Sequence, residues 1–194
     1  SGGTIGFSIK ENNFLGRGIA FGSNISLDKE SIKGIISLNN PNYKGTNRSL
    51  KVSAQSTVTD RLTDYGYKST KTGLSVGSGF EYYNDLFFTR GLSIFTEKLD
   101  AASNASASIK KQEGSYFDTF FNYTLDYDKR NQKYQPTDGY RNKFSQKIPL
   151  INKSNTLTNT LDYKTYSEIF NENIVSLGLY VSTTNSLNGK DVKL

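Results

Sequence analysis

Residues 125–141 read LDYDKRNQKYQPTDGYR and separate two runs in which aromatic or apolar residues alternate with polar ones, at 115–128 and 140–148. Pro136 and Gly139 bracket Thr137 and Asp138. Proline presets φ, aspartate bonds to nearby backbone, and glycine accepts a positive φ, so this is strong turn chemistry. The stretch predicts a reversal between two strands, with Asp138 capping the turn.

The same alternation recurs along the whole chain, which is rich in Gly, Tyr and Phe, residues typical of turns and strands. Several of the runs approach the roughly ten residues that a tilted transmembrane strand needs. We expect ten antiparallel strands, at residues 4–11, 19–27, 31–38, 49–58, 70–80, 86–95, 115–128, 140–148, 156–166 and 174–183.

Composition narrows the possible functions. The 194 residues include no Cys and no His, which removes a disulfide framework and the commonest metal ligand and general base. The net charge of +6 comes from Lys and Arg that are scattered and form no single stripe, which argues against nucleic-acid binding. No apolar run reaches the roughly 18 residues of a transmembrane helix. A membrane β-barrel is still possible, because only every second residue of its strands meets lipid.

The connections between the expected strands fall into two alternating groups. One group is short and motif-like, at residues 12–18, 39–48, 81–85, 129–139 and 167–173. The other is polar and variable, at 28–30, 59–69, 98–114, 149–155 and in the tail 185–194; we expect 59–69 to be a loop and 98–114 to be the longest loop. One end with the more variable loops is typical of an outer-membrane barrel.

The two faces of the strands differ in a way that also fits a barrel. Glycine and serine on the polar faces indicate an inward-facing, curved wall, as at Gly22, Ser26, Gly73, Gly77 and Gly79. Tyrosines near the motif-like ends would fit an aromatic girdle at a membrane interface; these are Tyr82, Tyr83, Tyr127 and Tyr134. The alternative is that they are strand-end tyrosines without a membrane role.

Arg90 does not fit this pattern, because it lies on the same face of its expected strand as the apolar residues Phe88 and Leu92. An arginine facing lipid at mid-bilayer costs roughly 2–4 kcal/mol. Either a bulge changes the register there, or Arg90 lies near an interface and extends its charged end towards water.

Charged residues on two neighbouring expected strands predict a ladder. Asp118, Asp126 and Asp128 share one face, and Arg141, Lys143 and Lys147 share a face of the next strand. The acids could imitate a carboxylate pair or a cation site, but no partner base or nucleophile is evident. A lumenal charge ladder is the simpler interpretation. We therefore predict no catalytic, cofactor-binding or metal-binding residue.

Three stretches together resemble the turns of the BamA-like surface-antigen family. The first is ENNFLGRG at 11–18, the second is NPNY at 40–43, and the third is the PTDGxR turn. The residues that carry the resemblance are Asn12, Asn13, Phe14, Leu15, Gly16, Gly18, Asn40, Pro41, Pro136, Thr137, Asp138, Gly139 and Arg141.

The resemblance implies an all-β fold, an antiparallel up-and-down transmembrane barrel of about sixteen strands preceded by soluble POTRA domains. On that template residues 1–194 form a partial outer-membrane barrel domain, roughly strands two to eleven. The chain lacks the POTRA domains, the first and C-terminal strands and the R-G-F signature of the family's large loop, so we expect a fragment.

The resemblance also implies a function and a location. Proteins of this family insert nascent β-barrel proteins into the outer membrane without covalent catalysis, by offering a strand edge and a thinned bilayer. The implied partners are outer-membrane lipids, nascent outer-membrane proteins and assembly-complex lipoproteins. The alternatives are a passive porin-like channel, a two-partner-secretion or TamA-type translocator, and a soluble β-sandwich or carbohydrate-binding module.

Overall fold

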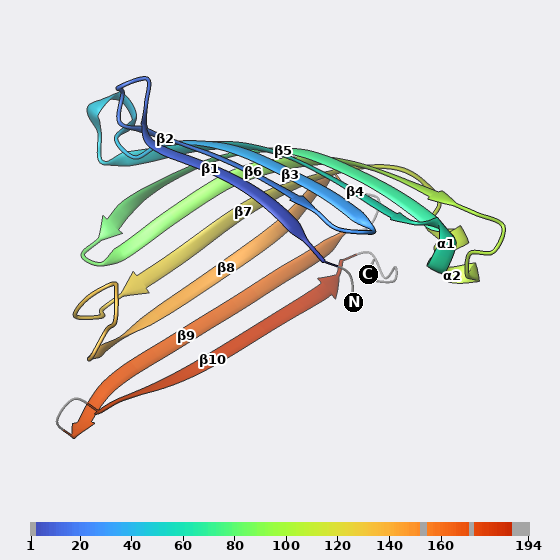
Figure 1. Ribbon diagram of the computed structural model, residues 1–194. Coiled ribbons are helices and arrows are strands. Elements are labelled where there is room, and N and C mark those ends of the chain that lie inside the picture. The colour runs from blue at the N-terminus through green and yellow to red at the C-terminus, as the bar shows by residue number, and fades with distance from the viewer. Residues whose placement is uncertain (1–2, 152–154, 171–172, 188–194) are drawn as a thin grey trace.

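Ten antiparallel strands form one sheet in which each strand pairs with the strands that precede and follow it in sequence. The computed structural model describes residues 3–151, 155–170 and 173–187. Figure 1 shows the up-and-down order that the alternation predicted. The strands are β1 (Ile5–Phe14), β2 (Ile19–Leu27), β3 (Ser31–Asn40), β4 (Arg48–Arg61), β5 (Tyr67–Tyr83), β6 (Leu86–Ala101), β7 (Gly114–Asp128), β8 (Gly139–Ile151), β9 (Thr156–Phe170) and β10 (Asn173–Ser186).

The two predicted loops at 59–69 and 98–114 are wrong in extent. β4 continues to Arg61, a short helix α1 (Leu62–Tyr65) makes the turn, and β5 resumes at Tyr67. β6 continues to Ala101, and only the segment around helix α2 (Ala107–Lys111) is a loop. The strands continue because the backbone ladder does not require apolar side chains, and polar residues can pair across it. Lys68, for example, lies opposite Asp60 and forms an ion pair with it at 3.1 Å.

The register separates the side chains into two faces. One face is lined by small and polar residues such as Ser75, which donates to the Ser93 hydroxyl at 3.0 Å. Asn122 also donates to that hydroxyl, at 2.9 Å. The opposite face carries exposed apolar residues such as Val76 and Leu92. Polar and apolar side chains therefore alternate along the strands, as expected for a sheet with a polar environment on one face and an apolar environment on the other.

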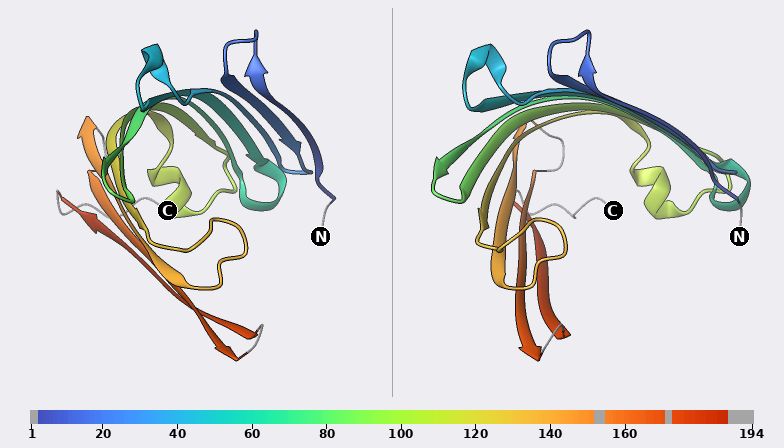
Figure 2. Two further views of the ribbon diagram at one scale, coloured as in Figure 1. Left: turned by 90° about the vertical axis from the view of Figure 1, so that its left-hand side faces the viewer. Right: turned by 60° about the vertical axis from the view of Figure 1, so that its left-hand side comes forward.

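The sheet is strongly curved into a trough (Figure 2). The polar face is the concave one and holds the buried residues of the sheet, Gly73, Ser93, Leu99 and Phe120. Glycines permit the curvature where strands approach closely: a Cβ at Gly91 would lie 2.8 Å from the Val76 carbonyl oxygen. Among the described residues, no pairing joins β1 to β10, so both remain edges of an open sheet.

The connections gather at two ends of the trough (Figure 1). The turn end carries the β1–β2, β3–β4, β5–β6 and β7–β8 connections, and the helix end carries α1, α2 and the β2–β3 turn. The expected connections 149–155 and 167–173 and the expected tail from 185 are also shorter than predicted, because β8 continues to Ile151, β9 to Phe170 and β10 to Ser186. Residues 152–154, 171–172 and 188–194 lie outside the described residues. In the part of the chain that is described, no helix is long and apolar enough to cross a membrane.

Candidate functional site at the turn end of the sheet

The β1–β2 connection is built around Asn13. Its side-chain oxygen accepts from the Gly18 backbone at 2.7 Å, and its own backbone N–H donates to the Glu11 carboxylate at 2.7 Å. Leu15 and Gly16 both have positive φ, of 58° and 68°. A positive φ is easy for glycine and costly for leucine, so the turn is held by its hydrogen bonds.

Two further residues of this motif shape the approach to the turn. The register between β1 and β2 shifts between Glu11 and Phe14, which places Asn12 in an irregular step. Phe14 then stacks on Phe21 of β2, with ring centroids 5.2 Å apart. The motif therefore fixes where this hairpin ends.

The β3–β4 connection begins at Asn40, the last residue of β3. Its side-chain oxygen accepts from the Asn42 backbone at 3.1 Å, on the far side of Pro41. A short 3-10 helix, η1 (Tyr43–Gly45), completes the turn. Both family-like motifs thus fold as compact polar turns at the same end of the sheet.

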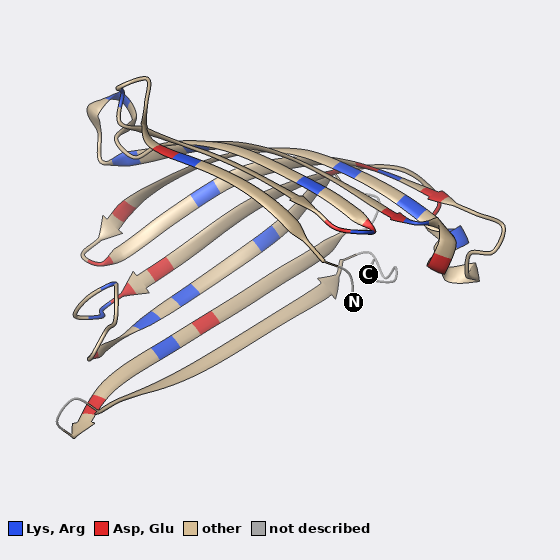
Figure 3. Ribbon diagram, viewed as in Figure 1, with Lys and Arg blue, Asp and Glu red and all other residues tan. Residues whose placement is uncertain are grey.

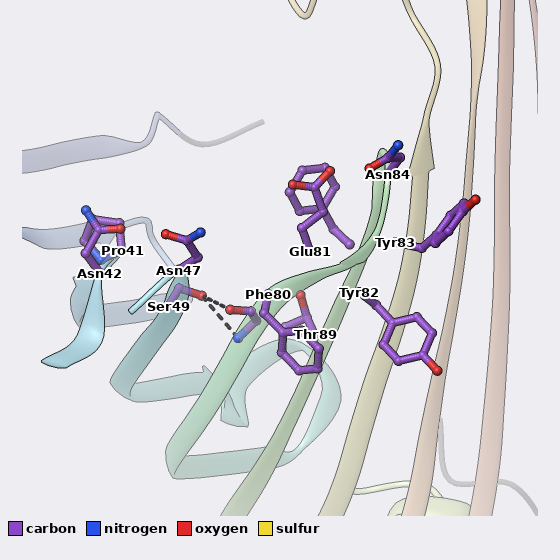
Figure 4. A pocket seen from close by; sticks show the side chains of 12 residues that line it. Pro41, Asn42, Asn47, Ser49, Phe80, Glu81, Tyr82, Tyr83, Asn84 and Thr89 are labelled. Carbon is purple, nitrogen blue, oxygen red and sulfur yellow. Dashed lines mark hydrogen bonds between the residues drawn. The ribbon is translucent and has the colours of Figure 1, made fainter. Parts of the chain in front are cut away.

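A hollow of about 730 Å³ lies between the β3–β4 and β5–β6 connections (Figure 4). Pro41 and Asn42 line one side, and Glu81, Tyr82 and Tyr83 line the other. The Glu81 carboxylate accepts from the Asp85 backbone at 2.9 Å and so braces the β5–β6 turn. The lining combines polar amide and hydroxyl groups with the aromatic rings of Tyr82 and Tyr83.

The β7–β8 connection occupies almost the whole of the expected stretch 129–139, with Pro136 near its end. β7 ends at Asp128 and β8 begins at Gly139, so the intervening residues all belong to the loop. Asn131 organises it, because its side-chain oxygen accepts from the backbone of Thr137 at 3.2 Å and of Asp138 at 3.3 Å. The expected capping role of Asp138 therefore belongs to the Asn131 side chain.

Gly139 is required at the end of this loop. Its φ is +96°, and a Cβ there would overlap the carbonyl oxygen of Lys129 and lie 2.9 Å from the Cα of Arg130. The two ends of the loop touch at this point: Lys129 donates its backbone N–H to the Tyr140 carbonyl at 2.8 Å.

Ion pairs tie the loop to the sheet. Arg130 donates from Nε and Nη2 to the two oxygens of Asp128, each at 2.7 Å, and both side chains are nearly buried, at 12% and 13% exposed. Hydrogen bonding to Asp128 raises the pKa of Arg130 above its ordinary value. Lys129 bonds to Asp85 of the β5–β6 turn at 2.7 Å, and this contact raises the pKa of Lys129. Two neighbouring connections are thus linked.

The loop folds towards the concave face (Figure 2). The Lys133 ammonium lies 5.9 Å from the centre of the Phe87 ring, and Phe87 shares its face with Thr89 and Gly91. The loop therefore covers part of the trough at the turn end.

The predicted charge ladder is partly assembled, on the neighbouring strands β7, β8 and β9, which all carry charged residues (Figure 3). Arg141 reaches diagonally to Asp126, with Nε 2.8 Å from Oδ1, because its direct partner Asp128 is occupied by Arg130. Lys143 lies between Asp126 and Asp162 in the register.

The other two members of the expected ladder are not paired with each other. Among the described residues, no ion pair joins Asp118 to Lys147. The Lys147 ammonium lies instead over the Phe120 ring, 3.7 Å from its centre. An aromatic face is itself an electrostatic partner for a cation.

Asp85, Asp126 and Asp128 are paired with lysine or arginine, whereas Glu11 and Glu81 accept hydrogen bonds from the backbone. Within the described ranges, no group of three His, Cys, Asp or Glu residues could hold a metal ion.

Sequence reasoning missed Asn131, Arg130 and the Lys129–Asp85 contact. Their signal was present in the alternating acids and bases of the DYDKR segment, 126–130, but those charges could be paired in several ways. Only the folded loop selects Asp128 for Arg130 and Asp85 for Lys129.

The convex face carries an aromatic band near the turn end. Tyr127 packs against Tyr140 and Tyr140 against Tyr163, with ring centroids 5.9 and 6.4 Å apart. Tyr134, expected in such a girdle, lies in the β7–β8 loop and is 89% exposed.

The bulge suggested for Arg90 is absent from the described register, since the only shift between β5 and β6 lies between Glu81 and Tyr83.

An up-and-down sheet with a polar concave face, an exposed apolar convex face and an aromatic band defines the wall of an outer-membrane β-barrel. The Omp85 superfamily domain matches residues 13–194, and the chain belongs to this superfamily. It is a protein of the bacterial outer membrane.

One solved structure shows the same fold. A crystal structure of BamA from Haemophilus ducreyi, lacking POTRA domains 1–3, is similar with a TM-score of 0.79 and 22% identity. The match covers 98% of this chain and 41% of that one, so the chain spans less than half of the BamA chain. No curated protein matches the sequence.

Proposed function

We propose that this chain is part of an outer-membrane factor that inserts nascent β-barrel proteins into the membrane. Membership of the Omp85 superfamily, over residues 13–194, is the observation that carries the proposal. Residues 1–194 supply a partial barrel domain, and the working protein includes further strands that close it. The proposed partners are outer-membrane lipids, nascent outer-membrane proteins and assembly-complex lipoproteins.

The proposed mechanism needs no covalent step. An open strand edge offers unpaired N–H and C=O groups, and a substrate strand can pair with them by β-augmentation. A thinned bilayer beside that edge lowers the cost of moving the new strand into lipid. The strands described here form the wall that holds the edge in place.

We also propose that the turn end faces the periplasm. Its connections are compact and held by side-chain hydrogen bonds at Asn13, Asn40 and Asn131. The three motifs that resemble the family's turns, at 11–18, 40–43 and 136–141, all lie at this end. The family-like motif residues, including Leu15, Pro136 and Thr137, then have a structural role in these turns.

Depletion of the complete protein in its own bacterium tests this function. We expect many unrelated outer-membrane barrels to lose assembly together, measured by the loss of their heat-resistant folded forms on gels. A defect limited to one secreted partner would indicate a two-partner-secretion translocator, and one limited to a few substrates a TamA-type factor. Normal assembly with altered solute permeability would indicate a porin-like channel.

A reconstituted system separates catalysis of insertion from indirect effects. Full-length protein in lipid vesicles is mixed with a urea-unfolded barrel substrate, and folding is followed by protection from protease. Faster folding than in vesicles holding an unrelated barrel supports the proposal, and equal rates contradict it.

A further inference from the structure

Arg90 is an exposed cation on the apolar convex face. It lies on β6 between Phe88 and Leu92, and its partners across the sheet are Ser78 and Tyr123. Within the described residues its guanidinium has no ion pair or hydrogen bond. An unpaired arginine on a membrane-facing surface requires an explanation, because its cost in lipid is greatest at the midplane and falls towards the interface.

Arg90 belongs to a row of polar residues that crosses the apolar face from strand to strand. The register connects one such residue on each of six strands: Ser78, Arg90, Tyr123, Gln146, Asn159 and Thr183.

The part of the row on β8 to β10 is satisfied by its own members. Gln146 donates to Asn159 at 2.5 Å, and Asn159 donates to Thr183 at 3.4 Å. The Arg90 guanidinium and the Tyr123 hydroxyl, on β6 and β7, have no such partner among the described residues. The unsatisfied donors of the row are therefore concentrated at one place.

The depth of Arg90 places it within reach of lipid headgroups. It is the fifth residue of β6, which begins at Leu86 at the turn end. At about 3.3 Å per residue and a tilt of about 40°, its Cα lies roughly 10 Å from that end of the strand. An arginine side chain leaning towards the turn end spans much of this distance.

The surroundings are suited to a lipid. Phe88 packs edge-on against Phe80, with centroids 5.8 Å apart, and lies 6.4 Å from the Tyr123 ring. These rings and Leu92 offer apolar contact for an acyl chain beside the cation. The other outer-face cation of β6, Lys98, is already paired with Asp100 at 3.0 Å.

We propose that Arg90 and Tyr123 bind the phosphate group of a phospholipid in the leaflet at the turn end. The planar guanidinium donates two parallel hydrogen bonds to phosphate oxygens, and the Tyr123 hydroxyl donates a third. The ligand is a lipid because the site opens onto the convex, membrane-facing surface. The site requires only the membrane location of the barrel and is independent of its activity in insertion.

Native mass spectrometry of the full-length protein tests the site. The protein is stripped of lipid in a phosphate-free maltoside detergent and titrated with phosphatidylglycerol. We expect Arg90→Gln to weaken binding of the tightest lipid about tenfold or more, and Arg90→Lys to weaken it less, because the bidentate geometry is lost while the charge remains. Tyr123→Phe should give a smaller loss. Lys98→Gln, the matched change on the same face, should bind as the unmodified protein does.

Equal lipid binding by Arg90→Gln and the unmodified protein would overturn the proposal, and so would an equal loss in Lys98→Gln. Inorganic phosphate that displaces the lipid at similar concentration would assign the site to a free anion instead. Folding is checked by heat-dependent mobility on gels. Should Arg90→Gln fail to fold, Arg90→Lys decides the question, because unchanged lipid binding in that variant contradicts the bidentate contact.

Discussion

At the scale of single residues, the turns depend on side chains that replace missing backbone partners. Asp28, between β2 and β3, shows this clearly: its carboxylate accepts from the backbone of Glu30 at 2.8 Å and of Ser31 at 2.6 Å, and from the Ser31 hydroxyl at 2.5 Å. These bonds, the hydroxyl first, lower the pKa of Asp28 below its ordinary 3.8. Hydrogen bonds to the charged form stabilise that form.

The Asp28 turn should therefore depend on pH. Because the folded pKa is lowered, the contribution to stability is complete above the unfolded pKa of 3.8 and is lost as pH falls through the folded value. Ser31→Ala should move the Asp28 titration upwards towards 3.8, as measured by carboxyl carbon NMR of the protein in micelles. Ser31→Thr keeps the hydroxyl and should leave the midpoint low; a midpoint equal in all three proteins would exclude the hydroxyl as the cause.

Gly139 gives a second prediction for one residue. Its positive φ and the overlap of any Cβ with the Lys129 carbonyl should make Gly139→Ala destabilising by roughly 1–3 kcal/mol. Gly34→Ala is the control, because nothing lies within 4 Å of a Cβ there. Urea unfolding of the complete protein in vesicles measures both, and a control as damaging as Gly139→Ala would refute the steric explanation.

At the scale of elements, the β7–β8 loop is held by two ion pairs of different exposure. Arg130 and Asp128 are 12% and 13% exposed, whereas Lys129 and Asp85 are 41% and 48% exposed. An exposed pair is screened by water, whereas removing one partner of a buried pair leaves a charge without compensation. The loop should therefore depend mainly on Arg130.

Substituting each cation separates the two contributions. Arg130→Gln should cost about 1.5–3 kcal/mol, the value typical of a hydrogen bond to a charged group, and should open the loop to protease. Lys129→Gln should change neither stability nor cleavage measurably. Limited proteolysis and urea unfolding of the full-length protein provide the test, and equal cleavage of both variants would contradict it.

At the scale of the whole molecule, the open sheet leaves β1 and β10 as edges among the described residues. Unpaired strand edges are templates for pairing with other chains, and barrel closure removes them. Residues 1–194 alone should therefore associate through these edges, while the complete barrel stays monomeric.

Two matched substitutions identify the surface responsible. Leu177 on β10 and Leu74 on the interior strand β5 are similarly exposed, at 68% and 61%. Leu177→Lys should reduce association of the isolated segment, measured by light scattering in detergent, because a charge on an edge strand opposes pairing. Leu74→Lys should have little effect. An equal reduction by both would show that the apolar face drives association.

Much of this architecture was predictable because its signal is local. Alternation with a period of two identifies strands without knowledge of their partners, and the expected strand 19–27 coincides with β2. Prediction failed where the pattern ends: residues 59–61 stay in the ladder although they are polar, and residues 98–101 stay in it with two charged side chains beside Leu99 and Ala101. No periodicity marks helices as short as α1 and α2. The roles of Asn131 and Arg130 could not be predicted for a different reason. The partner of a hydrogen bond or an ion pair depends on which groups lie close together in the folded chain.

The sequence by itself determined the ten strands, their order, their polar and apolar faces and the end at which the motif turns gather. Each of these follows from the pattern of neighbouring residues and from short connections. Only the tertiary structure decided which charges pair, how the β7–β8 loop folds onto the trough, and that Arg90 lies in a polar row crossing the apolar face. These features join residues distant in the chain, and they depend on register, which is a relation between strands and cannot be read from any one of them.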